Sequence, residues 1–284
     1  MTDATSLALR WRVRCGCVRF AGGGWFAVAG CRLAGDGSRV AVCGSAAGAG
    51  RDDMAAMPHD HPVNVIVFGA SGMVGQAVLR EVLADRRIER VLVVGRTPLP
   101  DRPDRVEEIV HGDFYDFSAV AGDMTGYDAC FFCLGVSSTG KKEPEYRRIT
   151  YDITMAAATV LARVDPTIAF LYVSGMGTDS SERGRLMWAR VKGATENALL
   201  SLPFRAYGIR PGFILPVHGV RTKTRLYSAA YQVTGWMYPV LRRIAPGYVM
   251  TSEELGRAMI VVAVDRPDQR LLATKDLKAL LDAV

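Results

Sequence analysis

The sequence predicts an α/β fold in which a doubly wound parallel sheet forms a single domain with a small C-terminal substrate lobe. Short continuous apolar runs such as 65–68 are typical of strands that are buried on both faces. Segments with helical spacing of apolar residues alternate with them, and the first carries Val74, Val78 and Val82. This alternation of strands and helices favours a parallel sheet.

The composition is that of an ordinary globular protein. The 284 residues are 49% hydrophobic and 23% charged, which excludes collagen, coiled coils and wholesale disorder. The net charge of +6 is spread along the chain without a run of five like charges, so we expect no nucleic-acid partner. No stretch of about 18 apolar residues free of charges occurs, and no transmembrane helix is predicted.

Residues 1–60 differ from the rest of the chain. They hold four of the six cysteines and lack both helical periodicity and a clear pattern of strands and turns. Three interpretations compete: an arginine-rich transit peptide, a disulfide module, and an extension from an upstream start, with the natural protein beginning at Met54 or Met57. Sparse serine counts against the first, and the cytosolic character of the remainder counts against the second. We therefore expect a disordered or spurious extension before a domain that covers 61–284, in a cytoplasmic protein.

Two histidines and two cysteines invite a metal or redox interpretation. His59 and His61 have no third or fourth ligand nearby, so no metal site is predicted there. Cys130 and Cys133 stand three apart on a predicted strand, where their side chains point to opposite faces and cannot share a ligand or a bridge. We expect both to be core thiols.

A glycine turn joins the first predicted strand to the first predicted helix. Gly69 lets the chain turn tightly, Gly72 lacks the Cβ that would block a pyrophosphate, and Gly75 lets the helix lie on the strand. The N-terminus of the helix presents free N–H groups to phosphates. Because a strand precedes this turn and a helix follows it, we interpret 69–75 as the phosphate-binding turn of a dinucleotide-binding, or Rossmann, fold.

The end of the second predicted strand, 91–94, is expected to select the dinucleotide. An acidic residue there would bind the ribose 2′-hydroxyl of NAD, whereas this sequence has Gly95, Arg96 and Thr97. No carboxylate is in place to repel a 2′-phosphate, and the guanidinium of Arg96 suits one. The sequence therefore favours NADP(H) over NAD(H). The alternative is that Arg96 only ends the strand in solvent.

The remaining elements continue the alternation. Further strands are expected at 106–110, 129–134, 168–173, 206–210 and 271–273. Further helices are expected at 145–164, around Lys192, at 254–264 with a capping signal that begins at Thr251, and at 274–284. The fifth strand delivers Ser174 to its carboxyl end, which is where ligands bind in open parallel sheets.

Six short motifs, taken in order, match a known family. Besides the glycine turn they are Gly112-Asp113, Leu134-Gly135, Val173-Ser174, Lys192 and Arg210-Pro211-Gly212. Together they resemble the short-chain dehydrogenase/reductase superfamily. More narrowly, they resemble its atypical or extended branches near the Tat-interacting-protein-2-like and epimerase/dehydratase-like proteins. The resemblance covers about 63–264.

The resemblance implies a role for each matching residue. The pyrophosphate turn would contain Gly69, Ser71, Gly72, Met73, Val74 and Gly75. Arg96 and Thr97 would bind the 2′-phosphate, Asp113 and Phe114 the adenine, and Leu134 and Gly135 the ribose and nicotinamide region. Pro211, Gly212 and Phe213 would run past the nicotinamide. In the catalytic set, Ser174 would polarise a substrate carbonyl and Lys192 would bind the nicotinamide ribose.

One residue departs from the family pattern. Four residues before Lys192, where the family has its catalytic tyrosine, stands Trp188, whose indole N–H cannot exchange a proton with an alkoxide. Another tyrosine (Tyr151, Tyr172, Tyr207 or Tyr227) would have to enter the site, or the proton would have to come from water. The remaining alternative is a fold that keeps its cofactor and has given up catalysis.

The segment after the sixth strand is expected to form the substrate lobe, at about 213–250. Within it, 226–241 carries aromatic residues between basic flanks, a pattern that suits either the roof of an apolar pocket or a helix in a membrane interface. Sixteen residues broken by Gly235 and Pro239 are too short to span a bilayer, and we favour the pocket roof.

The sequence thus predicts an atypical NADP-dependent oxidoreductase that acts on a small substrate which the sequence does not name. A non-catalytic NADP(H)-binding redox sensor or scaffold is the alternative, with Trp188 as the residue that separates the two. Sugar-nucleotide epimerisation ranks lower, since it needs the same tyrosine and a larger lobe. The sequence does not indicate an oligomeric state.

Overall fold

The computed structural model describes residues 16–19, 25–28, 62–217 and 243–284. The chain divides between Asp53 and Met54 into two units, each of which is described by itself. In the first unit β1 (Gly16–Arg19) and β2 (Trp25–Val28) pair antiparallel. The sequence showed no clear strand pattern in residues 1–60, so this strand pair was not predicted. The interpretation of the segment as an extension from an upstream start stays a prediction.

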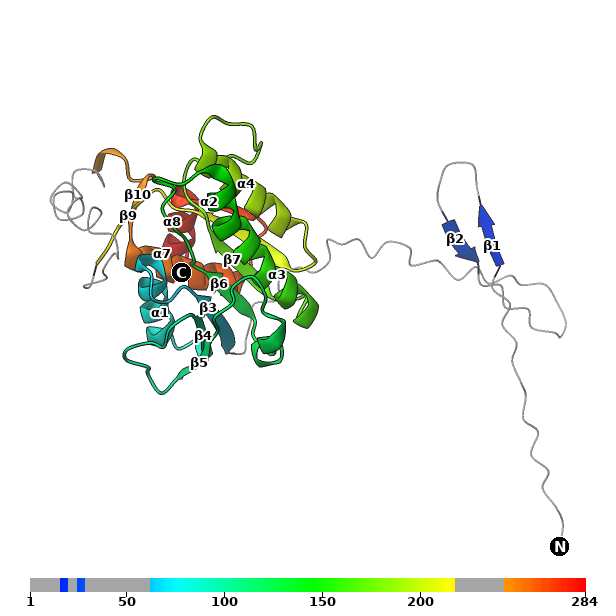
Figure 1. The fold of residues 1–284 in the computed structure, drawn as a ribbon, viewed down its shortest axis with the longest axis horizontal. Helices are drawn as coiled ribbons and strands as arrows, with labels where there is room; N and C mark the ends of the chain where they lie inside the picture. Colours follow the sequence, from blue (N-terminus) through cyan, green and yellow to red (C-terminus); the bar gives the residue numbers. More distant parts are fainter. Residues whose placement is uncertain (1–15, 20–24, 29–61, 218–242) are drawn as a thin grey trace, which may run out of the picture. The chain divides into compact units, whose positions relative to one another are not determined.

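The second unit is built on a seven-stranded parallel sheet (Figure 1). In chain order its strands are β3 (Val63–Phe68), β4 (Ile88–Gly95), β5 (Val106–Val110), β6 (Ala129–Phe132), β7 (Ala169–Val173), β8 (Arg205–Arg210) and β11 (Leu271–Ala273). They lie in the order β11, β8, β7, β6, β3, β4, β5, which confirms the predicted doubly wound sheet. The chain winds outward from β3 to β5 and then crosses back to β6, so the switch point where such sheets bind ligands lies between β3 and β6.

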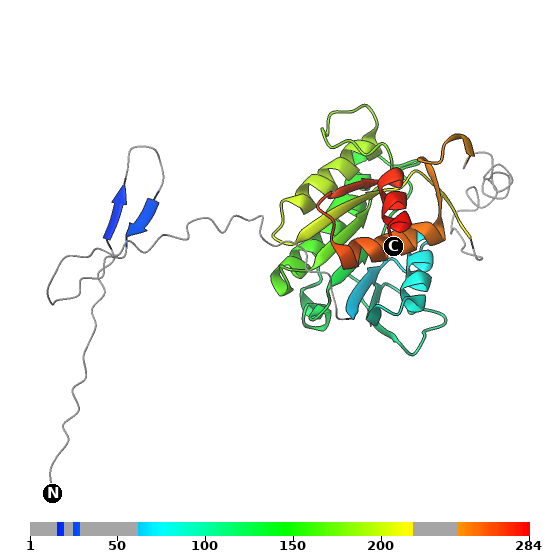
Figure 2. The same ribbon diagram turned by 180° about the vertical axis from the view of Figure 1, so that it is seen from behind.

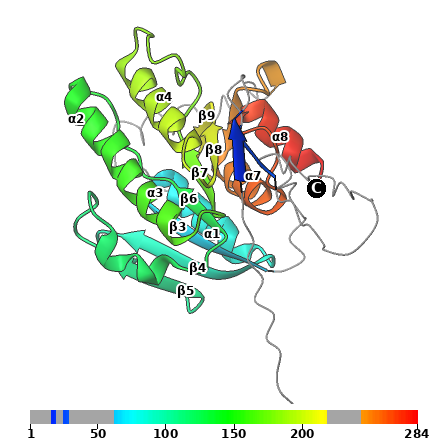
Figure 3. The same ribbon diagram turned by 90° about the vertical axis from the view of Figure 1, so that its right-hand side faces the viewer.

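Helices cover both faces of the sheet. They are α1 (Met73–Ala84), α2 (Glu143–Arg147), α3 (Ile153–Val164), α4 (Met187–Leu200), α7 (Ser252–Asp265) and α8 (Thr274–Asp282), with short 3₁₀ turns η1 (Ser118–Val120) and η2 (Gly122–Met124). Figure 2 shows α1, α7 and α8 together on one face, and Figure 3 shows α2, α3 and α4 on the other. A three-layer arrangement of this kind buries the central strands on both sides.

The central strand β3 shows why the apolar runs are continuous. Val65 and Val67 belong to the core under α1, α7 and α8, while Ile66 and Phe68 belong to the core under α3 and α4. All four side chains have 0% exposure. Since successive residues of a strand point to opposite faces, a strand with a core on each side needs an apolar residue at every position.

One predicted helix is interrupted. The sequence pattern predicts a single helix over 145–164, but the structure places a π-helical turn, η3 (Arg148–Asp152), between α2 and α3. The hydroxyl of Thr154 donates a 2.5 Å hydrogen bond to the carbonyl of Thr150 within this stretch. Such back-bonding competes with the regular ladder and bends helices, which a hydrophobic periodicity does not reveal.

The C-terminal part adds a small sheet and a capped helix. β9 (Phe213–Leu215) pairs parallel with β10 (Val249–Thr251). Thr251 and Glu254 form the predicted capping box at the start of α7, with bonds of 3.0 and 2.7 Å. The predicted roof at 226–241 lies outside the described residues. Of the helices that the structure describes, none has the length and apolar character needed to cross a membrane.

Candidate cofactor and active site

The glycine turn lies at the switch point of the sheet. Gly69 has a φ of +78°, and its carbonyl accepts the N–H of Gly72 at 2.9 Å. A Cβ on Gly75 would stand 2.0 Å from the same carbonyl oxygen, so α1 begins in direct contact with the turn. No side chain of the described residues caps α1, which leaves the N–H groups of its first turn available to an anion.

A pocket of about 200 Å³ opens beside this turn. Its walls come from the glycine turn and from the ends of β4 and β6, together with Phe114. Of the residues that the structure describes, Arg96 is the one charged residue that lines the pocket, and its guanidinium carbon lies 5.8 Å from the centre of the Phe114 ring. Phe114 is only 6% exposed, so the ring that Arg96 covers is fixed in the core. The pocket therefore pairs an aromatic wall with one exposed positive charge.

The pocket brings together part of the predicted cofactor set. The predicted residues that line it are Gly69, Ser71, Arg96, Thr97, Phe114 and Leu134. Asp113 does not line it, and its carboxylate instead accepts the N–H of Tyr115 at 2.8 Å. Gly72, Met73, Val74, Gly75 and Gly135 lie outside the lining as well, within or next to the turn, α1 and the end of β6.

Sequence reasoning missed five lining residues. They are Ala70, Val93, Val94, Gly95 and Leu99. Four of them lie in the turn or at the end of β4, so pairing β3 beside β4 could have found them. Leu99 is held by a 2.7 Å bond from its N–H to the carboxylate of Glu108, a contact between distant residues that no local pattern signals.

The second half of the predicted site lies along the same edge, at the ends of β7 and β8. Lys192, on α4, donates a hydrogen bond from its ammonium to the main-chain carbonyl of Ser174. The carbonyl of Pro211 accepts the N–H of Met176 at 2.8 Å, and the N–H of Gly212 donates to the Thr274 hydroxyl at 2.8 Å. These bonds fix the strand ends that lead into the predicted nicotinamide region, and Phe213 begins β9 directly after them.

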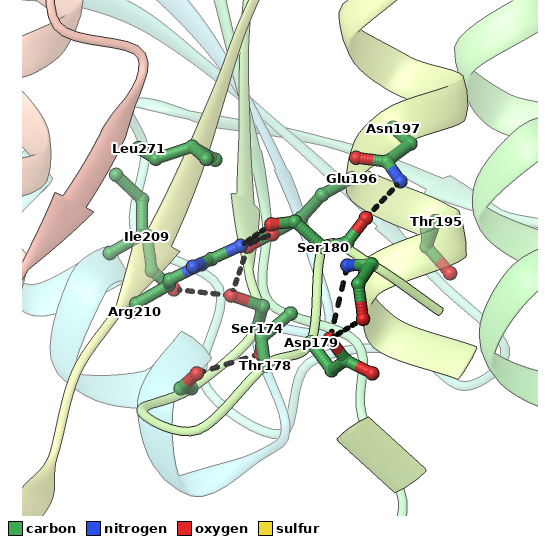
Figure 4. Close-up of polar contacts among 12 residues, drawn as sticks. Ser174, Thr178, Asp179, Ser180, Thr195, Glu196, Asn197, Ile209, Arg210 and Leu271 are labelled. Atoms are coloured by element: carbon green, nitrogen blue, oxygen red, sulfur yellow. Dashed lines mark hydrogen bonds and ion pairs between the residues drawn. The ribbon is translucent and has the colours of Figure 1, made fainter. Parts of the chain in front are cut away.

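The hydroxyl of Ser174 faces the protein interior. It donates to the carboxylate of Glu196 at 2.6 Å and lies 3.1 Å from the carbonyl of Ile209 (Figure 4). Glu196 is 1% exposed and is also paired with Arg210, whose Nε lies 3.1 Å from each carboxylate oxygen. The role of Ser174 on a substrate carbonyl stays a prediction, and these contacts do not favour it, because the single hydroxyl proton is already used.

The loop between β7 and α4 is held tightly against the helix. Arg210 donates to the hydroxyl of Ser180 at 2.5 Å, and Asn197 donates to the carbonyl of Ser180 at 2.9 Å. Figure 4 shows these residues with Asp179, which accepts from Ser181 at 2.6 Å. A Cβ on Gly193 would stand 1.8 Å from the Asp179 carbonyl oxygen, so this glycine permits the close approach of loop and helix.

The ammonium of Lys192 has an unusual environment. Burial lowers the pKa of Lys192 to about 8, and the nearby charge of Glu196 opposes that shift. Among the described residues Lys192 has no ion-pair partner, since Glu196 is bonded to Arg210. The lysine is therefore held by a carbonyl dipole alone.

Comparisons with known proteins find similar sequences and similar folds. A family described as NAD(P)H-binding matches residues 69–202. The chain is 26% identical over 226 residues to "Protein FMP52, mitochondrial" of Eremothecium gossypii, which covers 77% of this chain and 97% of that protein. It is 28% identical over 157 residues to Protein HTATIP2 of Rattus norvegicus, over 54% of this chain and 63% of that one. The enzyme WbmF of Bordetella bronchiseptica, solved with NAD⁺, superposes with a TM-score of 0.56 at 15% identity over 77% of each chain.

Residues 69–202 match an NAD(P)H-binding family, and the chain resembles atypical short-chain dehydrogenase/reductase-like proteins in sequence and fold. The resemblance noted in the sequence is thereby confirmed. The expectation of a cytoplasmic protein is contradicted, because the fungal relatives are named as mitochondrial proteins. A cytosolic composition is compatible with several compartments, so it could not decide the location.

Trp188, which the resemblance aligns with the catalytic tyrosine of short-chain dehydrogenases/reductases, lies on α4 and contacts Gly177. Its ring edge packs against Gly177, where a Cβ would lie 3.3 Å from Cη2, and Gly177 has a φ of +86°. Tyr172 and Tyr207 are each 1% exposed in the core. Tyr151 lines a different groove, beside α3, with the guanidinium of Arg147 4.1 Å from its ring centre.

These placements narrow the search for a substitute tyrosine. Two of the four named tyrosines are enclosed by the core, and a third lies in a groove that shares no lining residue with the pocket beside the glycine turn. Tyr227 lies outside the described residues.

The described residues contain no metal site or disulfide. No group of three or more potential metal ligands occurs among them, and His59 and His61 lie outside them. Cys130 and Cys133 are free thiols. Burial raises the pKa of both, that of Cys133 to about 12, so neither is a reactive thiolate at neutral pH.

Proposed function

We propose that the protein is an NADP(H)-dependent oxidoreductase that acts on a small carbonyl substrate. The observation that carries the coenzyme preference is the pocket beside the glycine turn: among the described residues its lining includes Arg96 and no carboxylate. A phosphate on the adenosine ribose pairs favourably with a guanidinium and is repelled by an acid in that position. NADP(H) is therefore expected to bind more tightly than NAD(H).

The residues along the sheet edge fit an extended dinucleotide. The uncapped start of α1 would hold the pyrophosphate, and Arg96 and Thr97 the 2′-phosphate. From the end of β4 the edge passes β3 and β6 to β7, three strand spacings or about 15 Å. Lys192 lies at this end of the edge, bonded to the Ser174 carbonyl at the end of β7, and the nicotinamide ring would bind next to it. The bound cofactor would supply the hydride, and the protein would orient the carbonyl that accepts it.

Transfer of a labelled hydride tests this function. Purified protein is incubated with a panel of aldehydes, ketones and quinones and with NADPH that carries deuterium at C4, and the products are analysed by mass spectrometry. Deuterium in a reduced product, formed faster with NADPH than with NADH, is the expected result. Tight NADPH binding without transfer to any carbonyl would contradict the oxidoreductase.

A non-catalytic NADP(H)-binding sensor remains the second candidate. Two observations favour it: Trp188 stands where a proton donor is expected, and the hydroxyl of Ser174 is engaged by Glu196. In a sensor, reduced and oxidised cofactor must bind with different affinities or stabilise different conformations. Equal protection from proteolysis by NADPH and NADP⁺ would count against it.

A further inference from the structure

Several polar groups lie near the end of β7, and they differ in whether they have a proton available for transfer. The Ser174 hydroxyl donates a hydrogen bond to the Glu196 carboxylate, and the Thr178 hydroxyl donates one to the carbonyl of Gly175 at 2.7 Å. Trp188 carries an indole N–H that does not ionise. Lys192 alone among these four carries a proton that it can release near neutral pH.

The hydrogen bonds of Glu196 explain why it does not form an ion pair with Lys192. Its carboxylate, 1% exposed, accepts from Arg210 and from Ser174, so both oxygens are occupied (Figure 4). A carboxylate bonded directly to Lys192 would hold the ammonium charged. Because Glu196 is bonded to Arg210 instead, its charge acts on Lys192 only through space, and within the described part of the chain the ammonium has one hydrogen-bond partner, the Ser174 carbonyl.

The other ionisable groups around this part of α4 do not compete for the proton. Tyr172 on β7 and Tyr146 on α2 are buried, and burial raises the pKa of both, so each stays neutral. Arg210 on β8 forms an ion pair with Glu196. A pKa of about 8 leaves Lys192 mostly protonated at pH 7 and still able to give up a proton, which is the condition for a general acid.

We propose that Lys192 is the proton donor for carbonyl reduction in this protein, in place of a tyrosine. The inference rests on the proposed function. As the carbonyl carbon accepts hydride from the reduced nicotinamide, its C=O π pair moves to oxygen, an Nζ–H bond of Lys192 breaks and an O–H bond forms. The carbonyl gains two electrons and becomes an alcohol, while the nicotinamide is oxidised. Lys192 is left as a neutral amine, which takes a proton from water.

This step predicts opposite pH dependences of kcat for carbonyl reduction and for alcohol oxidation. Reduction needs protonated Lys192, so its kcat is constant below pH 8 and falls about tenfold per pH unit above it. Oxidation of the alcohol needs the neutral amine, so its kcat rises with pH and levels off above pH 8.

The variants Lys192→Arg and Lys192→Met test the assignment, with Lys142→Met as the matched control at an exposed lysine outside the site. Arginine keeps the charge and the hydrogen-bond donors but cannot release a proton, so it restores an anchoring role and not a proton transfer. We expect kcat of reduction to fall about a hundredfold or more in both Lys192 variants, and NADPH to bind Lys192→Arg within a few-fold of wild type.

The lysine pKa supplies a readout that needs no substrate. The chain has six lysines, and reductive methylation with ¹³C-formaldehyde gives each a resonance that can be titrated by NMR in the presence of NADPH. One lysine resonance should titrate near pH 8, vanish in Lys192→Met and persist in Lys142→Met, whereas the resonance of the N-terminal α-amino group, which also titrates near pH 8, persists in both variants.

The outcomes separate the two proposals. Wild-type protein that binds NADPH and reduces no carbonyl overturns the proposed function and this step with it. Wild-type protein that reduces a carbonyl, but whose Lys192→Arg variant keeps kcat within threefold or whose Lys192 titrates above pH 10, overturns the lysine step alone.

Discussion

The hydroxyl of Ser174 donates a 2.6 Å hydrogen bond to the carboxylate of Glu196, 22 positions further along the chain. This bond sets the orientation of the Ser174 side chain at the end of β7. The side chain of Ser174 is drawn into the interior, and its main-chain carbonyl is left to hold Lys192. Ser174 thus contributes its main-chain carbonyl to the contact with Lys192, and our proposal assigns the proton transfer to Lys192.

Replacing Trp188 tests whether a proton donor limits turnover. In Trp188→Tyr a phenol stands one turn before Lys192, whose charge favours its ionisation. We expect carbonyl reduction to become about tenfold faster than in the wild type. Trp188→Phe, which changes packing against Gly177 without adding a donor, should show no gain. Equal rates in the two variants at normal NADPH affinity would argue against a limiting proton transfer.

Replacing Glu196 tests the buried network. Glu196→Gln leaves the guanidinium of Arg210, whose side chain is 20% exposed, without its buried countercharge. The free energy of unfolding, measured by urea denaturation, should fall by about 3 kcal/mol. Glu143→Gln breaks the more exposed pair with Arg190 and should cost at most about 1 kcal/mol. A loss for Glu196→Gln as small as that of the control would mean that the network contributes little to stability.

The depressed pKa of Lys192 makes a prediction about stability and pH. Between about pH 8 and the unfolded value of 10.5, the unfolded chain keeps a proton on this lysine that the folded chain has lost. The contribution of Lys192 to stability therefore rises with pH across this window, by on the order of 3 kcal/mol.

Buried thiols and tyrosines with raised pKa values act in the opposite direction above pH 9, so the difference between wild type and Lys192→Met is the quantity to follow. The free-energy difference between the two proteins should change in favour of the wild type from pH 8 to 10. A free-energy difference between the two proteins that does not change with pH would mean that the Lys192 ammonium is solvated in the folded protein.

The contact between Gly75 and Gly69 predicts a sharp contrast between two glycines. A Cβ on Gly75 would overlap the Gly69 carbonyl, so Gly75→Ala should force α1 away from the turn, cost more than about 3 kcal/mol and abolish NADPH binding. A Cβ on Gly112 would meet nothing within 4 Å, and Gly112→Ala should change stability by less than about 1 kcal/mol. Thermal unfolding and NADPH titration of the two variants check this, and tight NADPH binding by a stable Gly75→Ala would refute the packing role.

The parts of the fold that follow from local chemistry could be predicted. The strand at 65–68, the turn at 69–75 and the capping box at Thr251 each depend on neighbouring residues, and each occurs as expected. The π-helical turn at 148–152 could not be predicted, since a shift of one residue within a helix leaves the apolar pattern almost unchanged.

The candidate site was harder to predict, because its contacts join distant parts of the chain. The orientation of Ser174 depends on Glu196 from α4 and Arg210 from β8, and a motif that places a serine after a strand does not specify its rotamer. The wall at Leu99 depends in the same way on Glu108. Residue types at strand ends were thus predictable, whereas the direction of their side chains was not.

The ratio of the NADPH and NADH dissociation constants tests the central claim most directly. Isothermal titration calorimetry gives this ratio for the wild type, for Arg96→Ala and for Arg102→Ala. Arg102 is an exposed arginine outside the pocket and serves as the control. We predict that the wild type prefers NADPH by at least about tenfold and that Arg96→Ala loses about 1.5–3 kcal/mol of that preference, with Arg102→Ala unchanged. Equal affinity of the wild type for both nucleotides, or a preference that survives in Arg96→Ala, would contradict an NADP(H) site built around Arg96.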